Sequence, residues 1–141
     1  MHILNYLAGI IDGEGCIAIT KVKPYGLHKT PRYYFKLTIE MQDKKVIDYL
    51  AKHFERNIME HKPYGNRKRP SYRIDWQADK ASTILKKVRP YLIGKRNQAD
   101  VGIEFQKHIA CKNRSGVILS NEEIAIRDNF HHIIRQLKLN P

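Results

Sequence analysis

Alternation of apolar and polar residues between Tyr34 and Met41 restricts the fold of this chain more than any other feature. Phe35, Leu37 and Ile39 occupy every second position, and polar residues fill the positions between them. Side chains point alternately to the two faces of a β-strand, so this stretch predicts a strand with one apolar and one polar face. Such a strand packs its apolar face on helices and presents the other face to water or to a ligand.

The segments around this strand predict two hairpins that are separated by one helix. Turn residues close the hairpins at 24–26 and 65–66, and Asp43 and Asp79 are suited to cap helix starts. Because strands joined by turns pair antiparallel, we expect an α+β fold of the order αββαββα with further helices at the C-terminus. The expected elements are a helix over 3–13, strands over 16–23 and 34–41, a helix over 44–54, strands over 58–64 and 71–77, a helix from Asp79 to Pro90, and helices over 95–108 and about 120–139.

Apolar stripes on three of the expected helices predict which faces meet the core. Ser120 and Glu123 have the spacing of a capping box at the start of the last helix. The predicted core positions are Val46, Ile47, Leu50, Ala51 and Phe54 in one helix, Ala81, Ile84, Leu85 and Val88 in the next, and Ile126, Phe130, Ile133, Ile134 and Leu137 in the last.

Composition excludes several classes of protein. The 141 residues correspond to one domain, and a hydrophobic share of 42% is typical of a globular chain. No apolar stretch reaches the ~18 residues of a membrane helix, and no basic segment precedes the apolar N-terminus, so neither a membrane span nor a signal peptide is expected. Cys16 and Cys111 have neither disulfide nor zinc spacing, which favours an intracellular, reducing compartment, whether an organelle or a bacterial or archaeal cytoplasm.

The charge of the chain predicts a polyanionic partner. There are 26 Lys and Arg residues against 14 Asp and Glu, a formal charge of +12. Both hairpins carry this excess together with tyrosines and amides, and a two-stranded ribbon fits the major groove of DNA. We therefore expect DNA on the open face of the sheet, at Thr20, Lys21, Lys23, Tyr25, His28, Lys29, Arg32, Tyr34, Lys36, Thr38, Glu40, Glu60, Lys62, Tyr64, Asn66, Arg67, Arg69, Ser71, Arg73 and Asp75.

Carboxylates on such a face have two interpretations. Glu40 and Asp75 either accept hydrogen bonds from cytosine amino groups or pair with neighbouring Lys and Arg side chains on the sheet. The sequence leaves both interpretations open.

The first helix breaks two local rules near its end. Gly9 and Gly13 lie four residues apart, on one face, where small residues allow two helices to pack closely. Asp12 and Glu14 stand at the C-terminal end, where the helix dipole disfavours carboxylates. Such departures are expected at functional sites. The pattern predicts either a tightly packed helix pair with an acidic, cation-binding tip, or a short core helix that ends in a Gly-x-Gly turn with a solvated Glu.

Residues 7–15, Leu-Ala-Gly-Ile-Ile-Asp-Gly-Glu-Gly, resemble the LAGLIDADG motif of the homing endonucleases. The order of helices and strands and the stretch Lys95…Gln98-Ala99 resemble that family as well, over residues 3 to about 110. The resemblance implies a single domain over 1–141 with a saddle-shaped sheet, and a site-specific double-strand DNA endonuclease of the kind that acts in intron homing. The family places two motif helices at a central interface, and this chain has one copy, so a homodimer is implied. The implied interface residues are Leu4, Tyr6, Ala8, Gly9, Asp12 and Gly13.

The resemblance also implies the residues of the active site. Glu14 stands at the acidic motif position that binds divalent metal, and Gly13 would contribute its carbonyl. The usual consensus has Asp there, so the longer side chain leaves the metal geometry open. Lys95 would order water or neutralise charge, or it is an ordinary lysine at a helix start. Asp43 and Gln98 would join the water network, although Asp43 also suits a helix cap.

The expected chemistry follows from two carboxylates near a two-fold axis. Two Glu14 side chains would repel each other, and hard divalent cations relieve that repulsion. We expect Mg²⁺, with Mn²⁺ as a substitute and Ca²⁺ bound without cleavage; the metal would activate water and stabilise the leaving 3′ oxygen. A strand of about nine residues spans roughly 30 Å, or about nine base pairs, so two protomers would cover a nearly palindromic site of about 18–20 base pairs.

Two other functions compete with this interpretation. The same fold could serve as an RNA-binding intron maturase, or as a catalytically inactive, sequence-specific DNA-binding dimer. An RNA-binding ribosomal or translation protein would share the charge, but it would not account for the Gly- and Ala-rich helix with an acidic tip.

Overall fold

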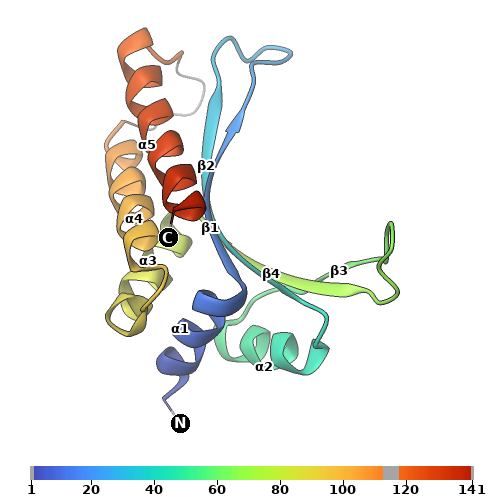
Figure 1. Ribbon diagram of the computed structural model, residues 1–141. Coiled ribbons are helices and arrows are strands. Elements are labelled where there is room, and N and C mark those ends of the chain that lie inside the picture. Colours follow the sequence, from blue (N-terminus) through green and yellow to red (C-terminus); the bar gives the residue numbers. More distant parts are fainter. Residues whose placement is uncertain (1, 113–117, 141) are drawn as a thin grey trace.

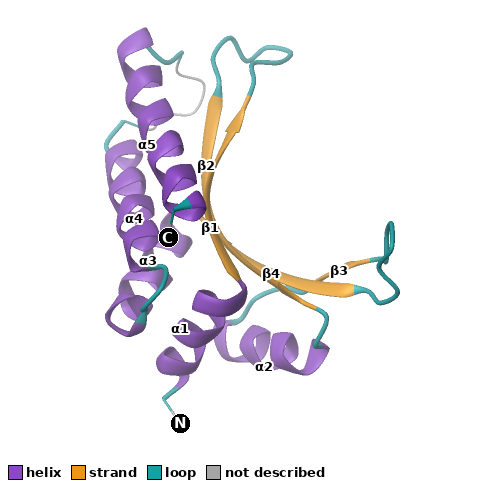
Figure 2. Cartoon of the chain, viewed as in Figure 1, coloured by secondary structure: helices purple, strands orange, loops and turns teal. Residues whose placement is uncertain are grey.

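The computed structural model describes residues 2–112 and 118–140, and it confirms the expected order of helices and strands (Figures 1 and 2). The fold is α+β, with one antiparallel sheet and helices on one of its sides. The elements are α1 (Ile3–Glu14), β1 (Gly15–Val22), β2 (Arg32–Met41), α2 (Lys44–Phe54), β3 (Met59–His61), β4 (Ser71–Gln77), α3 (Ala78–Val88), the short 3₁₀ helix η1 (Arg89–Tyr91), α4 (Arg96–Ala110) and α5 (Asn121–Leu139).

The sheet has the order β1-β2-β4-β3, so the two hairpins join through their second strands. β1 pairs with β2 along Arg32–Ile39, whereas β4 pairs only with Lys36–Met41. The segment from Arg32 to Phe35 therefore has no strand partner on the β4 side among the described residues. In Figure 1 the sheet curves strongly, with α3, α4 and α5 behind the first hairpin, α1 and α2 below the second, and the concave side open.

The apolar face of the sheet forms the core, as the alternation predicts. Phe35, Leu37 and Ile39 are buried on β2, and Ile74 and Trp76 are buried on β4. The predicted core residues of α3 are buried as well, and those of α2 are buried or packed against the core.

Close packing of α4 on β2 depends on a glycine. A Cβ atom at Gly102 would lie 2.3 Å from Cε2 of Phe35, so only glycine allows this approach.

Two predictions about helices are wrong in detail. Gln77, not Asp79, precedes the first residue of α3, and the Asp79 carboxylate instead accepts a hydrogen bond from Gln106 at 2.9 Å. In α5, Ile126 and Ile133 are 40% and 38% exposed rather than buried.

The face of α5 that turns inward carries charged residues. Glu123 and Arg127 are buried there and form an ion pair at 2.7 Å, which His108 of α4 joins at 2.8 Å. Burial raises the pKa of Glu123, but hydrogen bonds from Arg127 and His108 outweigh burial and lower that pKa. A buried charge is tolerated when it is paired in this way, so α5 carries polar residues inward. Ser120 does accept from the Glu123 amide at 3.1 Å, which is half of the expected capping box.

Candidate nucleic-acid interface and catalytic centre

The concave face of the sheet carries alternate side chains of every strand. Cross-strand register places Thr20 opposite Tyr34, Thr38 opposite Asp75 and Glu40 opposite Arg73 on this face. The exposed or half-buried polar residues of β2 all lie here, because their neighbours in the chain turn toward the core.

Aromatic rings stack with arginines toward the ends of both hairpins. The Arg32 guanidinium lies 4.8 Å from the Tyr25 ring centre and 5.7 Å from that of Tyr34. Arg67 lies 4.8 Å from the Tyr64 ring centre in the second hairpin. These cation–π pairs hold the long arginine side chains in defined positions, and Arg32 Nη2 also donates to the Tyr25 hydroxyl.

Two residues expected on this face lie elsewhere. Lys21 is opposite Tyr33 on the helix side of the sheet, and its Nζ is 2.7 Å from Asp128 of α5. The Tyr33 hydroxyl donates to the same carboxylate at 2.5 Å, and hydrogen bonds from Lys21 and Tyr33 lower the pKa of Asp128. Glu60 is opposite Tyr72, again on the side of the helices. Lys21 and Glu60 therefore do not belong to the concave surface.

Glu40 is committed to contacts within the protein. Its carboxylate accepts from Ser71 Oγ at 2.5 Å and from Arg73 Nη2 at 2.9 Å, and His61 Nδ1 lies 2.9 Å away. Burial raises the pKa of Glu40, but the hydrogen bonds from Ser71, His61 and Arg73 outweigh it and bring that pKa down from 4.5 to about 2. The pairing interpretation of Glu40 is the one that this geometry supports. His61 was missed by the sequence analysis, because the register that brings it to Glu40 is not visible in a single chain segment.

Helix α1 presents glycine rather than alanine to the outside. Gly9 and Gly13 are exposed, and a Cβ atom at either position would meet nothing within 4 Å. Ala8 is fully buried inside the protomer, so its expected place in a dimer interface is wrong. Leu4 and Tyr6 are half-buried against the core, and the Tyr6 ring meets Tyr49 of α2 edge-on.

Asp12 organises the segment that enters α4. Its two oxygens accept from the amides of Ile93 at 2.8 Å and Lys95 at 2.9 Å. A carboxylate that accepts two backbone hydrogen bonds is held firmly. Asp12 therefore ties the end of α1 to the start of α4 within one protomer.

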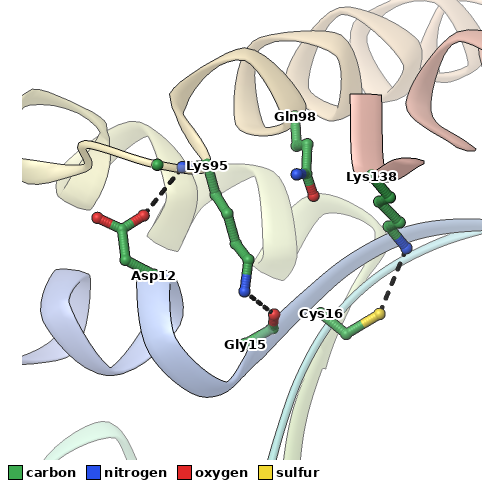
Figure 3. A pocket seen from close by; sticks show the side chains of 7 residues that line it. Asp12, Gly15, Cys16, Lys95, Gln98 and Lys138 are labelled. Carbon is green, nitrogen blue, oxygen red and sulfur yellow. Dashed lines mark hydrogen bonds between the residues drawn. The ribbon is translucent and has the colours of Figure 1, made fainter. Parts of the chain in front are cut away.

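Lys95 also contacts the end of α1. Its Nζ donates to the carbonyl of Ile11 at 2.9 Å. It also donates to the carbonyl of Gly15, as Figure 3 shows. A lysine at a helix C-terminus satisfies free carbonyl groups and complements the dipole. A Cβ atom at Gly15 would lie 2.8 Å from Ile11 Cα, so the turn that follows Glu14 is closely packed.

A pocket of about 370 Å³ lies beside this lysine, and Asp12, Gln98 and Lys138 also line it. Figure 3 shows Gln98 between Lys95 and Lys138, and Lys138 Nζ lies 3.4 Å from Cys16 Sγ. Lys138 stands at the far end of the chain, so no local sequence signal could have placed it here.

Glu14 lies on the other side of the α1–β1 turn. It is exposed, and it lines a second pocket, of about 410 Å³, together with Gln42 and Asp43. Asp43 accepts from the Lys45 amide at 3.0 Å and so caps α2 as expected. Glu14 and Asp43 therefore line one pocket, and Lys95 and Gln98 line the other. The two pockets lie on either side of the α1–β1 turn.

The oxygen donors around Glu14 suit a hard divalent cation. Within residues 2–112 and 118–140 of one protomer, however, no group of three or more His, Cys, Asp or Glu side chains lies close enough together to hold a metal ion. A metal at Glu14 would need further oxygen ligands from backbone, DNA, water or a second protomer. No helix in the same described ranges is long and apolar enough to cross a membrane.

Comparison with protein families gives a match over most of the chain. The sequence profile of the family described as "LAGLIDADG endonuclease" matches residues 7–107. A search of curated protein sequences gives no match.

Solved structures of homing endonucleases share the fold. I-CvuI, solved in complex with a DNA target in the presence of Mg, matches with a TM-score of 0.75 at 17% identity, over 96% of this chain and 81% of that chain. The archaeal intron-encoded homing endonuclease I-Vdi141I, complexed with DNA, matches with a TM-score of 0.60 at 15% identity, over 97% of each chain. I-SmaMI, bound to cleaved DNA, matches with a TM-score of 0.69 at 13% identity, over 91% of this chain but only 42% of that chain.

Proposed function

The chain belongs to the LAGLIDADG endonuclease family and is a site-specific, metal-dependent DNA endonuclease, and we propose that it acts as a homodimer that cuts both strands of a long, nearly palindromic site. The observation that carries this proposal is the position of Glu14. It is exposed at the C-terminal end of α1, directly before β1, and it lines a pocket together with Glu40 and Ser71 of the concave sheet.

Three observations support the homodimer. Gly9 and Gly13 form an exposed face on which a second helix could pack closely. Among the described residues of one protomer, no three His, Cys, Asp or Glu side chains lie close enough together to hold a metal ion. The chain also corresponds to 42% of the I-SmaMI chain and to 97% of the I-Vdi141I chain. A single copy that pairs with itself would supply two acidic helix ends at one axis.

Glu14 and the carbonyl of Gly13 would hold the metal, and Mg²⁺ is the cation that their oxygen chemistry favours. Two solved I-CvuI complexes contain DNA with Mg or with Ca, which agrees with a divalent cation in this fold. When bound, the metal would activate water and stabilise the leaving 3′ oxygen. We propose that Mn²⁺ substitutes and that Ca²⁺ binds without supporting cleavage.

Positioning residues surround this centre. Lys95 holds the carbonyls of Ile11 and Gly15, on either side of the segment that carries Glu14, so it fixes where that carboxylate stands. Asp43 and Gln98 line the two adjacent pockets, where each could hydrogen-bond an attacking or bridging water.

The concave sheet would bind the duplex. A charge of +12 favours phosphate contacts, and the alternating side chains of β2 and β4 would reach base edges in the major groove. The expected residues at the hairpin ends, from Lys23 to Lys29 and from Lys62 to Arg69, remain proposals for contacts farther from the centre. Two protomers would then read about 18–20 base pairs.

The test is a cleavage assay on a duplex selected by binding from a randomised pool. Wild-type protein should cut both strands in Mg²⁺ and bind without cutting in Ca²⁺. Glu14→Gln should bind the duplex with similar affinity in Ca²⁺ but lose cleavage by at least 100-fold, while the matched change Glu104→Gln on the outer surface of α4 should have no effect. Cleavage by Glu14→Gln at the wild-type rate would refute the metal assignment. Tight binding of structured RNA, without cleavage of any duplex, would refute the endonuclease assignment.

A further inference from the structure

The loops that close the two hairpins repeat one sequence pattern. Residues 23–33 are Lys-Pro-Tyr-Gly-Leu-His-Lys-Thr-Pro-Arg-Tyr, and residues 62–72 are Lys-Pro-Tyr-Gly-Asn-Arg-Lys-Arg-Pro-Ser-Tyr. Seven of the 11 positions are identical, without any gap between the two segments. We call residues 23–33 the first tip and residues 62–72 the second tip. Neither tip contains Asp or Glu, so the formal charge of both is purely positive.

The two tips also occupy the same place in their hairpins. The pair Val22 and Arg32 closes the first loop, and the pair His61 and Ser71 closes the second. Strand pairing therefore stops at the same position of the repeat, and loop residues 23–31 and 62–70 lie beyond it. In Figure 1 the two loops lie at the two far ends of the curved sheet.

The backbone forms the same turn in both tips. In the first tip, the amide of His28 donates to the carbonyl of Tyr25 at 3.0 Å. In the second tip, the amide of Arg67 donates to the carbonyl of Tyr64 at 3.2 Å. The shared glycine has a φ of 58° in the first tip and 60° in the second, in the left-handed region that glycine adopts at low cost. The repeat in sequence is therefore a repeat in structure.

The shared tyrosine is supported from the same position in both tips. The ring of His28 lies 5.6 Å from that of Tyr25, and the Arg67 guanidinium lies 4.8 Å from the ring centre of Tyr64. Two lysines in each tip are exposed, namely Lys23, Lys29, Lys62 and Lys68. Each tip thus presents a tyrosine and two lysines in the same arrangement along the chain. Such side chains bind DNA phosphates whatever the base sequence is.

Four positions differ between the tips, and two of them are used within the protein. Thr30 Oγ1 accepts from the Leu119 amide at 3.3 Å. At the other position, Arg32 contacts tyrosine rings in the first tip, and Ser71 donates to Glu40 in the second. An exchange at these two positions would therefore change contacts that hold the hairpins in place.

The other two differences are adjacent, at the corner of the turn. Leu27 and His28 of the first tip correspond to Asn66 and Arg67 of the second, and all four residues are exposed. Leu27 is 99% exposed and offers only an apolar contact, for which the thymine methyl group is the partner in the major groove. Asn pairs best with adenine, and Arg with guanine. The two corners therefore suit different bases.

We propose that the two tips are interchangeable DNA-reading modules, in which the shared residues bind phosphates and the two corner residues select bases. The inference rests on the proposed function, because its ligand is the DNA duplex. It adds that positions 27–28 and 66–67 determine base preference at the two hairpin ends. Because the shared residues build the same turn around each corner, a corner that is moved from one tip to the other should keep its base preference.

Binding selection from a randomised duplex pool, in Ca²⁺ and with the full chain, tests this transfer. Wild type should select two separate groups of bases in each half of the site, and one group should contain thymine. The double variant Leu27→Asn/His28→Arg should change only that group, from thymine to the adenine or guanine of the other group. The reverse double variant, Asn66→Leu/Arg67→His, should change only the other group, and there it should introduce thymine.

The variant with all four substitutions gives the sharpest comparison. It should bind a duplex in which the two groups of base pairs are exchanged, in one of the two strand orientations, at least tenfold more tightly than the wild-type duplex. Wild type should show the opposite preference. All four residues are exposed, so the urea unfolding midpoint should be unchanged. Equal affinity of the folded variant for both duplexes, or double variants that leave base preference unaltered, would overturn the inference.

Substitutions at a shared position test the other half of the proposal. Lys29→Ala and Lys68→Ala should each weaken binding to all duplexes alike and lower its salt dependence by about one phosphate contact. The matched change Lys107→Ala, on the exposed side of α4, should do neither. A changed base preference in Lys29→Ala or Lys68→Ala would contradict the division between shared and corner residues.

Failure of this inference is distinct from failure of the proposed function. A wild-type protein that selects no duplex sequence would refute both. A wild-type protein that selects and cleaves a site, while the corner variants do not transfer base preference, would refute only the interchangeable tips.

Discussion

Replacing Glu40 by Gln should destabilise the protein in a way that depends on pH. The pKa of this carboxyl falls from 4.5 to about 2 on folding, and at about 1.4 kcal/mol per pKa unit the ionised side chain contributes about 3 kcal/mol at pH 7. The side chain is 25% exposed, so solvent screens the contacts only in part. Because the pKa is lowered in the folded state, this stabilisation is present above pH 4.5 and is lost as the pH falls toward 2.

Urea unfolding measures this contribution directly. Trp76 is the single tryptophan and is 4% exposed, so its fluorescence reports loss of the core. At pH 7, Glu40→Gln should lower the free energy of unfolding by about 3 kcal/mol, and at pH 3 by only about 1.4 kcal/mol. Protein concentration must stay fixed, because a dimer links stability to concentration.

A matched control separates the effect of the Glu40 hydrogen bonds from general effects of removing a negative charge. Glu104→Gln, on the exposed side of α4, should change stability by less than about 0.5 kcal/mol at both pH values. If Glu40→Gln destabilises the protein equally at pH 7 and pH 3, the ionised carboxylate is not the source of the stability, and the reasoning from its three donors is wrong.

Three further predictions follow from contacts elsewhere in the fold. Gly102→Ala should lower the unfolding free energy by about 1–3 kcal/mol, measured in urea, because the new methyl group would overlap Phe35; an unchanged midpoint would show that α4 can move away. Lys36→Ala should reduce the salt dependence of DNA binding by about one phosphate contact, and Lys21→Ala, on the helix side of the sheet, should leave it unchanged; a reversed result would contradict the assigned faces. Asp12→Ala should lower the unfolding free energy by about 1–3 kcal/mol, because two backbone donors lose their acceptor, and amide exchange at 93 and 95 should accelerate; unchanged exchange would contradict the anchoring role.

Periodicity and turn chemistry account for most of what the sequence predicts about the fold. The alternation in β2 and the apolar stripes of α2 and α3 reflect local geometry, and each appears in the structure as expected. The inward face of α5 was predicted wrongly because hydrophobicity alone assigned it. Its buried Glu123 is paired by His108 and Arg127, and the contact with His108 forms only when α4 and α5 meet.

The residues of the candidate site also differ in whether the sequence alone could place them. The motif predicts Glu14 and Gly13 as metal ligands, and the position of Asp43 before a helix predicts that it caps that helix. Lys21 could have been placed correctly from the sequence, because it shares the spacing of the buried Ile17 and Ile19. Glu60 could not, because its orientation depends on a register with β4 that no single segment reveals. His61 and Lys138 required the tertiary structure for the same reason.

The junction between the two hairpins has a consequence for how new DNA specificities can arise. β2 and β4 share only the segment from Lys36 to Met41, and each hairpin extends beyond it on its own. Substitutions toward either hairpin end can therefore accumulate without disturbing the other hairpin. The pair Glu40–Arg73 crosses the junction, so a change in one of these residues should select for a compensating change in the other. Residues toward the hairpin ends should therefore tolerate single substitutions, in evolution and in engineering. Glu40 and Arg73 should tolerate substitution only when both change together.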